Sequence, residues 1–322
     1  MQNDSQNQTQ FRIGISSCLL GNKVRFDGGH KHDRFITDTL GKYVTFVPVC
    51  PEVECGLGIP REALRLVGDS DEYRLVFSRS GGDITDKMKT WAGEKLALLE
   101  KENLCGFIFK SRSPSSGMER VKIYSQKGAV SLKGRGVFAG MFMDRFPEIP
   151  VEEEGRLNDP VLRENFIERI FTLNRWRELS SNKKNLGSLV EFHTCNKLLI
   201  LSHSTEIYRE MGKLVADGKK YEISDLYNKY ATLLISALSL KATTKKNLNV
   251  LYHMMGYFKK ELSKDEKEEI IEVFTDYAEQ KTPLIVPLTL LKHFVRKYDP
   301  EYLKKQTYLS PHPLEMQLRN HV

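Results

Sequence analysis

Three short apolar runs in the first half of the chain each lead directly into a polar loop, and this arrangement constrains the fold most. The runs cover residues 11–15, 43–49 and 104–109, and the second is rich in β-branched and aromatic residues. Such runs predict buried strands. Between the second and third runs, residues 83–104 carry apolar side chains at near-helical spacing, with Asp83 or Thr85 as the expected N-cap. This alternation predicts an α/β domain with a mainly parallel sheet.

The three expected strands end in loops that carry reactive or polar side chains. Cys18 follows the first strand, Cys50 follows the second, and a serine-rich turn at residues 111–117 follows the third. In open α/β sheets, binding sites form outside the carboxyl ends of the strands. If the three strands are neighbours, their loops converge on one site.

The second half of the chain has a different pattern, because its apolar residues recur at helical spacing throughout. Helical segments are expected over residues 158–179, 189–215, 221–240, 248–262, 264–278 and 288–298. We therefore expect an all-α C-terminal domain after the α/β domain. The predicted division is a disordered tail at residues 1–10, an α/β domain at 11–180 with a trailing helix from about 157, a linker at 181–188 and a helical domain at 189–322.

Length and composition exclude several classes of protein. The 322 residues exceed the usual size of one domain, and a hydrophobic content of 40% is sufficient for packed cores. No apolar run reaches the roughly 18 residues of a membrane span, and the polar start lacks the features of a secretory signal. We therefore expect a cytoplasmic protein that has no membrane partner.

The five cysteines, at positions 18, 50, 55, 105 and 195, form no CxxC pair. In a reducing compartment such a sparse, odd set is not a disulfide framework, and buried thiols are the ordinary interpretation. Zinc is disfavoured because four ligands of familiar spacing are missing. Iron–sulfur clusters accept thiolates from distant loops, and three convergent loops could leave one iron open to a substrate.

The charge of the chain is consistent with an anionic partner. The net charge is +7, and between residues 101 and 140 eight basic residues accompany only two acidic ones. This stretch surrounds the serine-rich turn. A basic excess of this density is typical of phosphate contact, although a solvated surface produces the same pattern.

Four short strings surround the three loops, namely Ser17-Cys18-Leu19-Leu20-Gly21, Val24-Arg25-Phe26-Asp27-Gly28, Pro48-Val49-Cys50-Pro51-Glu52 and Ser113-Pro114-Ser115-Ser116-Gly117. In this order they resemble the TudS family of thiouracil desulfurases. The second half, with Phe192-His193 and Gly256-Tyr257-Phe258, looks like the helical domain of the YbgA type. The order of the two halves resembles fused bacterial desulfidases of the RudS type, which remove sulfur from 4-thiouridine in tRNA.

This resemblance implies an oxygen-sensitive 4Fe–4S cluster that has three cysteine ligands and one open iron. Cys18 and Cys50 match the first two ligands. The implied reaction is non-redox, and water replaces the sulfur of a thiocarbonyl held at the open iron. Glu52 is the expected acid–base group, and Ser113 is expected to orient it or the water. The expected substrate-binding residues are Arg25, Asp27 and Arg112.

Position 116 departs from the family pattern. The third family ligand is the cysteine of a Ser-Pro-Ser-Cys-Gly turn, and Ser116 occupies its place here. A serine oxygen is a poor replacement for a thiolate toward iron. Three interpretations stay open: a cysteine replaced to disable or trap the site, a takeover by Cys55 or Cys105, or loss of the cluster. The intact turn favours the first, and Cys55 is the better of the two substitute ligands.

The leading hypothesis is an iron–sulfur-dependent desulfidase that converts 4-thiouridine in bacterial tRNA to uridine, inactive in this form if Ser116 prevents cluster binding. Its expected partner is tRNA, and DNA is not expected. Lysine pairs in the helical half, such as Lys219-Lys220 and Lys245-Lys246, agree with an RNA partner. One alternative is a desulfidase for free thiobases such as 2-thiouracil. Another is an RNA-binding protein without a cluster.

Overall fold

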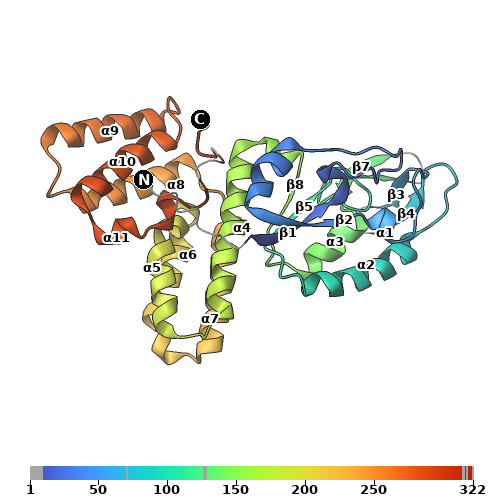
Figure 1. Ribbon diagram of the computed structural model, residues 1–322, viewed down its shortest axis with the longest axis horizontal. Coiled ribbons are helices and arrows are strands. Elements are labelled where there is room, and N and C mark those ends of the chain that lie inside the picture. The colour runs from blue at the N-terminus through green and yellow to red at the C-terminus, as the bar shows by residue number, and fades with distance from the viewer. Residues whose placement is uncertain (1–9, 70–71, 126–128, 314–315, 317, 321–322) are drawn as a thin grey trace. The chain divides into compact units, whose positions relative to one another are not determined.

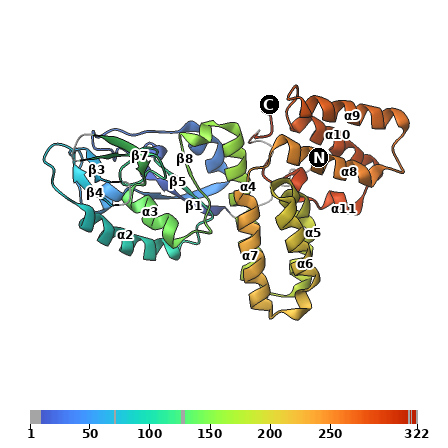
Figure 2. The ribbon, with the colours of Figure 1, turned by 180° about the vertical axis from the view of Figure 1, so that it is seen from behind.

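The computed structural model describes residues 10–69, 72–125, 129–313, 316 and 318–320. Within it the chain divides into two compact units, with the boundary between Asn158 and Asp159. Figures 1 and 2 show the strands and helices of each unit from opposite sides. Residues 1–9 of the expected tail lie outside the described part of the chain.

A parallel sheet forms the centre of the first unit, as the alternation of strands and helices predicts. Its strands lie in the order β2-β1-β5-β8, and all three neighbouring pairs are parallel. Three of these strands match the apolar runs of the sequence, and the short fourth strand was not predicted. The bounds are β1 Phe11–Ser16, β2 Val44–Val49, β5 Phe107–Phe109 and β8 Val151–Glu153.

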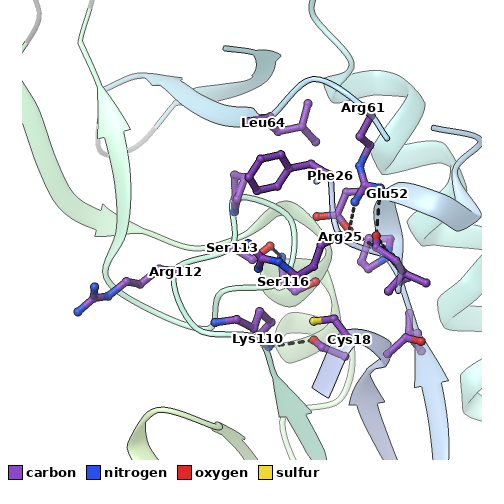
Figure 3. Close-up of a pocket in the computed structure, with 18 of the residues that line it drawn as sticks. Cys18, Arg25, Phe26, Glu52, Arg61, Leu64, Lys110, Arg112, Ser113 and Ser116 are labelled. Carbon is purple, nitrogen blue, oxygen red and sulfur yellow. Dashed lines mark hydrogen bonds and ion pairs between the residues drawn. The ribbon is translucent and has the colours of Figure 1, made fainter. Parts of the chain in front are cut away.

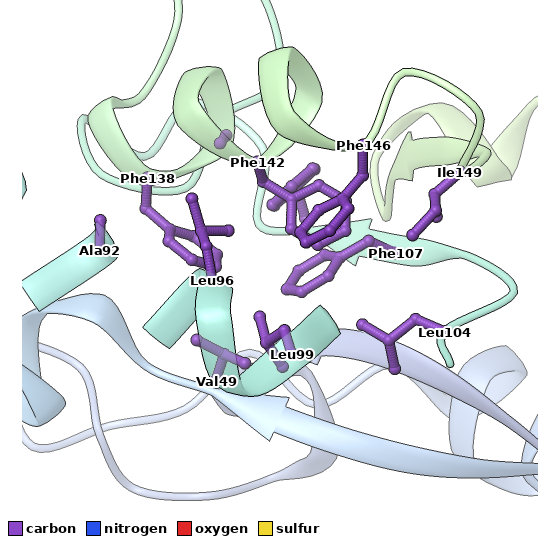
Figure 4. Packing of buried hydrophobic residues seen from close by; sticks show 12 residues of the cluster. Val49, Ala92, Leu96, Leu99, Leu104, Phe107, Phe138, Phe142, Phe146 and Ile149 are labelled. Atoms are coloured by element: carbon purple, nitrogen blue, oxygen red, sulfur yellow. The ribbon is translucent and has the colours of Figure 1, made fainter. Parts of the chain in front are cut away.

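Helices α2 (Thr85–Glu100) and α3 (Val137–Arg145) pack with this sheet around an aromatic core (Figure 4). The ring of Phe107 lies 4.2 Å from that of Phe109 and 4.7 Å from that of Phe142, measured between centroids. Aromatic pairs at such distances stabilise a core beyond simple burial. Gly14 of β1 makes room for this stack, because a Cβ there would lie 2.2 Å from the Phe107 ring.

A second sheet in the first unit was not predicted from the sequence. Its order is β4-β3-β6-β7, with β3 and β6 parallel and the outer pairs antiparallel. Leu66 and Ile123 of this sheet pack with Met88 of α2 on one face only. Its strands therefore carry polar residues, such as Arg65 and Lys122, beside the buried apolar ones. The bounds are β3 Leu64–Gly68, β4 Tyr73–Phe77, β6 Val121–Tyr124 and β7 Val130–Gly134.

The second unit is helical over its described residues, as expected. The apolar pattern over residues 189–215 predicts one helix, whereas the structure has two, because Ser204 has an extended backbone and its hydroxyl caps α6 by accepting from the Ile207 N–H. None of the described helices combines the length and hydropathy that a membrane crossing requires. The bounds are α4 Pro160–Ser181, α5 Leu186–His203, α6 Thr205–Ala216, α7 Ile223–Ser239, α8 Thr244–Met255, α9 Lys264–Ala278, α10 Ile285–Tyr298 and α11 Glu301–Lys304.

Helix α4 belongs to the helical unit and not to the first domain, where the sequence analysis placed it. The ring of Trp176 in α4 lies 5.1 Å from that of Tyr230 in α7 and 5.4 Å from that of Phe192 in α5. These contacts make α4 part of the second core, so the boundary moves from about residue 180 to 158. The segment expected as the linker, residues 181–188, therefore lies inside the helical unit, where a short connection joins the end of α4 at Ser181 to the start of α5 at Leu186.

Candidate functional site

Loops at the carboxyl end of the parallel sheet enclose a cavity of about 300 Å³ (Figure 3). Cys18 lies in a short 3₁₀ helix, Ser17–Leu20, directly after β1. Cys50 follows β2 and is the N-cap residue of the one-turn helix α1 (Pro51–Glu54). The sheet pairs Ser16 with Val49, so the two cysteines leave adjacent strands at nearly the same level. The serine-rich turn after β5 lines the same cavity.

All but one of the expected site residues line this cavity. They are Cys18, Arg25, Cys50, Glu52, Arg112, Ser113 and Ser116. The exception is Asp27, which is exposed and does not line the cavity. Its carboxylate lies 3.4 Å from Nε of Arg25 and accepts a hydrogen bond from the Gly29 N–H. Asp27 therefore pairs with Arg25 outside the cavity, and the expectation that it lines the pocket is wrong.

Cys18 and Cys50 are buried thiols in this structure. Burial raises the pKa of Cys18 to about 11, and the Glu52 carboxylate adds to this rise while Lys110 opposes it. Burial and then Glu52 raise the pKa of Cys50 to about 12. Without a bound cation, both side chains are therefore thiols at neutral pH. A metal centre would reverse this preference, because it stabilises the thiolate.

Glu52 lies between the cysteine loops and the serine-rich turn. Its Oε2 atom is 3.5 Å from Sγ of Cys50 and 3.8 Å from Nη2 of Arg61. Its Oε1 atom accepts a short hydrogen bond from the Ser115 hydroxyl. The hydroxyl of Ser115 is in turn 3.0 Å from that of Ser113. Ser113 is therefore linked to Glu52 through Ser115, a residue that was not predicted as part of the site.

A second group of polar residues at the site was also missed. Nζ of Lys110 lies 2.5 Å from Oε1 of Glu154, whose Oε2 accepts from the Ser111 N–H at 2.7 Å. The Lys110 N–H donates to Oγ of Ser16 at 2.9 Å, which joins the β5 loop to the end of β1. Lys110 could have been found because it directly follows a predicted strand. Glu154 follows β8, and no sequence signal marked that strand.

The serine-rich turn rests on the amino end of α3. The backbone N–H of Phe138 donates to the Ser115 carbonyl at 2.9 Å, and that of Gly136 donates to the Gly117 carbonyl at 2.7 Å. A Cβ at Gly136 would lie 2.5 Å from the carbonyl carbon of Ser115. Only glycine fits here without displacing the turn, so Gly136 sets the position of Ser115 and Ser116 in the cavity.

The donor atoms fit an iron–sulfur cluster at two of the three expected positions. Cys18 and Cys50 supply sulfur, whereas Ser116 is buried on the cavity wall and supplies only a hydroxyl oxygen. Cys55 packs in the apolar cluster beneath the second sheet, and Cys105 precedes β5 at the amino end of the parallel sheet. Neither is among the cavity-lining residues of the described chain, so the alternative in which one of them takes over the third position has no support in this geometry.

Comparisons with known proteins match the two units separately. The family described as 2-thiouracil desulfurase matches residues 13–154, and the family of unknown function DUF1722 matches residues 197–313. The uncharacterized protein YbgA of Escherichia coli (strain K12) is 31% identical over 153 residues, which are 47% of this chain and 90% of YbgA. The uncharacterized protein YbbK of Bacillus subtilis (strain 168) is 30% identical over 152 residues, 46% of this chain and 98% of YbbK. A solved structure described as the 4Fe–4S-dependent thiouracil desulfidase TudS aligns with a TM-score of 0.39 and 30% identity, covering 47% of this chain and 95% of that chain.

Proposed function

Because the chain belongs to the 2-thiouracil desulfurase family in its first unit and to the YbgA-like DUF1722 family in its second, we propose that it is a desulfidase acting on 4-thiouridine in tRNA. One observation carries the proposal: two cysteines, two carboxylates and three arginines line a single cavity at the carboxyl end of the parallel sheet. This combination supplies soft donor atoms for a metal centre, a proton carrier and cationic groups for a polar substrate.

We propose that Cys18 and Cys50 hold a 4Fe–4S cluster and that position 116 is its third point of attachment. When bound with one iron open, such a cluster supplies a soft Lewis acid suited to a thiocarbonyl sulfur. Ser116 does not suit this role, so the form with serine is expected to hold a cluster poorly or not at all. A cysteine at this position would complete the donor set.

Glu52 is the proposed proton carrier of the site. The hydroxyl of Ser115 occupies Oε1, which leaves Oε2, beside the Cys50 thiol, to take a proton from water in the cavity. Arg61, whose guanidinium is 3.8 Å from Oε2, helps to fix the direction of the carboxylate. Arg25 lines the same cavity and offers hydrogen-bond donors to the carbonyl of a pyrimidine base.

The experiment that tests the proposal starts from the Ser116→Cys variant, purified without oxygen beside the unchanged chain. We expect the variant to bind iron and sulfide, to show the charge-transfer absorbance of an iron–sulfur cluster, and to convert 4-thiouridine in tRNA to uridine. Nucleoside analysis of the digested tRNA measures that conversion. If Ser116→Cys binds no iron, the cluster proposal is wrong.

A second candidate function is the desulfidation of free thiobases, because the matching family is described by 2-thiouracil. The two candidates differ in one measurement. Incubation of the Ser116→Cys variant with 4-thiouridine tRNA and, separately, with 2-thiouracil shows which substrate loses sulfur. Unchanged 4-thiouridine beside consumed 2-thiouracil would overturn the tRNA version and leave the free-base version.

A further inference from the structure

A hollow of about 930 Å³ lies over the second sheet, next to the cavity of the candidate site. Arg65 of β3 and Lys122 and Tyr124 of β6 alternate along their strands with the buried Leu66 and Ile123. Successive side chains of a strand point to opposite faces, so these three lie on the face away from the core. We call this hollow the basic groove and define it by Arg65, Arg112, Arg120, Lys122 and Tyr124.

Every charged side chain that lines the basic groove is positive. Among the described residues, none of its arginines or its lysine forms an ion pair, whereas Arg25, Arg61 and Lys110 of the neighbouring cavity are paired with carboxylates. Positive groups gathered without carboxylate partners repel one another, and a phosphate ligand relieves that repulsion. The groove is therefore suited to a polyanion, in contrast to the neutralised cavity beside it.

Two of the groove arginines occupy backbone positions that favour glycine. Arg112 has a φ of 59° and Arg120 a φ of 54°, both in the left-handed region. A non-glycine residue in this region costs on the order of 1 kcal/mol, so a long basic side chain is held there against the local preference of the backbone. Figure 3 shows that Arg112 extends away from Cys18 and Ser116.

The basic groove and the cavity adjoin each other. Leu64, Arg112 and Pro114 line both of them. A chain lying in the groove can therefore place one unit in the cavity while its neighbours stay on the sheet. The groove also offers an aromatic ring, Tyr124, and an exposed apolar side chain, Leu132, against which a flanking base can stack.

We propose that the basic groove holds the RNA strand next to the nucleotide whose base enters the cavity. Arg65, Arg120 and Lys122 would then contact its phosphates, and Arg112 would contact the phosphate at the junction. This inference rests on the proposed tRNA substrate. A free thiobase has no phosphate and would make no use of the groove, so the groove accounts for a preference for RNA over free base.

The test uses the chain as it is, because RNA binding requires no cluster. The affinity for 4-thiouridine-containing tRNA is measured by fluorescence anisotropy at several salt concentrations. In the Arg65→Glu/Lys122→Glu variant we expect affinity to fall by about tenfold or more. The slope of log affinity against log salt should become shallower by about 2, because two phosphate contacts are lost. The milder Arg65→Gln/Lys122→Gln variant should change in the same direction.

The matched control is Lys89→Glu/Lys101→Glu, which makes the same change of charge at two exposed lysines on and after α2. We expect this control to bind tRNA nearly as well as the unchanged chain, and circular dichroism verifies that all variants are folded. If the unchanged chain binds tRNA and the groove variants bind equally well, the groove inference is wrong and the proposed function stands. If the control loses as much tRNA affinity as the groove variants do, the groove inference is also wrong. If the unchanged chain does not bind tRNA, the proposed function fails together with the inference.

Discussion

The Sγ atom of Cys50 lies 3.5 Å from the Oε2 atom of Glu52, and both side chains face the cavity at the end of the parallel sheet. The negative charge of Glu52 adds to the effect of burial in raising the pKa of the Cys50 thiol. The charge of Glu52 disfavours the thiolate form of Cys50. A role besides stability is therefore needed to explain why a carboxylate lies beside this sulfur atom. Proton transfer at the cavity is that role in the proposed function.

Replacing Glu52 by glutamine tests this role. In the Ser116→Cys background we expect Glu52→Gln to lower the desulfidation rate by about 10²- to 10⁴-fold, the usual contribution of a positioned acid–base group. Iron content should stay unchanged, because Glu52 is not a proposed ligand. The control is Glu62→Gln, which also alters a cavity-lining carboxylate but one that accepts the Ser80 N–H. Equal losses in both variants would contradict the assignment.

The same substitution gives a readout that needs no cluster. Burial and, after it, the Glu52 carboxylate raise the pKa of Cys50 above the ordinary value of a thiol, so removal of the carboxylate should lower that pKa. A larger thiolate fraction at mildly alkaline pH makes the thiol more reactive. We expect iodoacetamide to modify Cys50 faster in Glu52→Gln than in the unchanged chain, as measured by mass spectrometry of the peptide. A slower reaction would show that the carboxylate does not act on this thiol.

The cysteines divide into two groups with different expected effects. In the Ser116→Cys background, Cys18→Ser and Cys50→Ser should abolish incorporation of iron and sulfide, because each removes a thiolate from the cavity. The matched control, Cys55→Ser, changes a thiol that packs beneath the second sheet, and it should retain the cluster. Iron and acid-labile sulfide per chain are the quantities measured. If Cys55→Ser lost its iron while Cys18→Ser and Cys50→Ser kept theirs, Cys55 would be identified as a ligand and the assignment of the other two would be wrong.

Gly136 supports the serine-rich turn, and a methyl group there has no room. We expect Gly136→Ala to lower the free energy of unfolding by about 1–3 kcal/mol through overpacking against Ser115. Gly93 lies on the exposed side of α2 with nothing within 4 Å of an added Cβ. Gly93→Ala should instead stabilise the protein by up to about 1 kcal/mol, because alanine is the better helix former. Urea denaturation measures both, and equal effects would contradict the contact.

A buried histidine should make the helical unit sensitive to acid. Nδ1 of His193 lies 3.2 Å from the hydroxyl of Tyr230, and burial, followed by the charge of Lys197, lowers the pKa of His193 to about 4. Its contribution to stability is therefore complete above the unfolded pKa of about 6.5 and is lost as pH falls toward the folded value.

Between pH 7.5 and 5.0, this one group should reduce the free energy of unfolding by about 2 kcal/mol. The share of His193 should be absent in His193→Gln, in which the buried His312, whose pKa burial also lowers to about 4, still contributes its own share. His253→Gln, which changes an exposed histidine on α8, should retain the full reduction. Urea denaturation followed by circular dichroism at the two pH values measures the difference. The same pH dependence in all three proteins would show that His193 is not its source.

Three strands of the parallel sheet are the part of the fold that the sequence predicts well. The runs before Cys18, before Cys50 and before the serine-rich turn are mostly apolar, and each forms a strand of the parallel sheet. The second sheet was missed because only one of its faces is buried. Helix α4 was assigned to the wrong unit because sequence spacing shows that a helix has an apolar face but not which core it contacts.

In the candidate site, the residues that directly follow a predicted strand could be anticipated, and those from other segments of the chain could not. Cys18, Cys50 and Ser113 are adjacent to predicted strands, so their place at one edge could be anticipated. Arg61 and Glu154 reach the site only through folding of distant segments, and no local pattern marks them. The exposure of Asp27 likewise depends on a turn in which Gly29 binds its carboxylate.

The parallel pairing of β1 with β2, from Phe11 with Val44 to Ser16 with Val49, has an evolutionary consequence. The two cysteines lie within two residues of the ends of these paired strands, whereas Arg25, Arg61 and Arg112 come from irregular segments around the cavity. Loops accept substitutions, insertions and deletions more readily than paired strands. The wall that selects the substrate can therefore diverge among descendants of this fold while the spacing of the thiols is inherited unchanged.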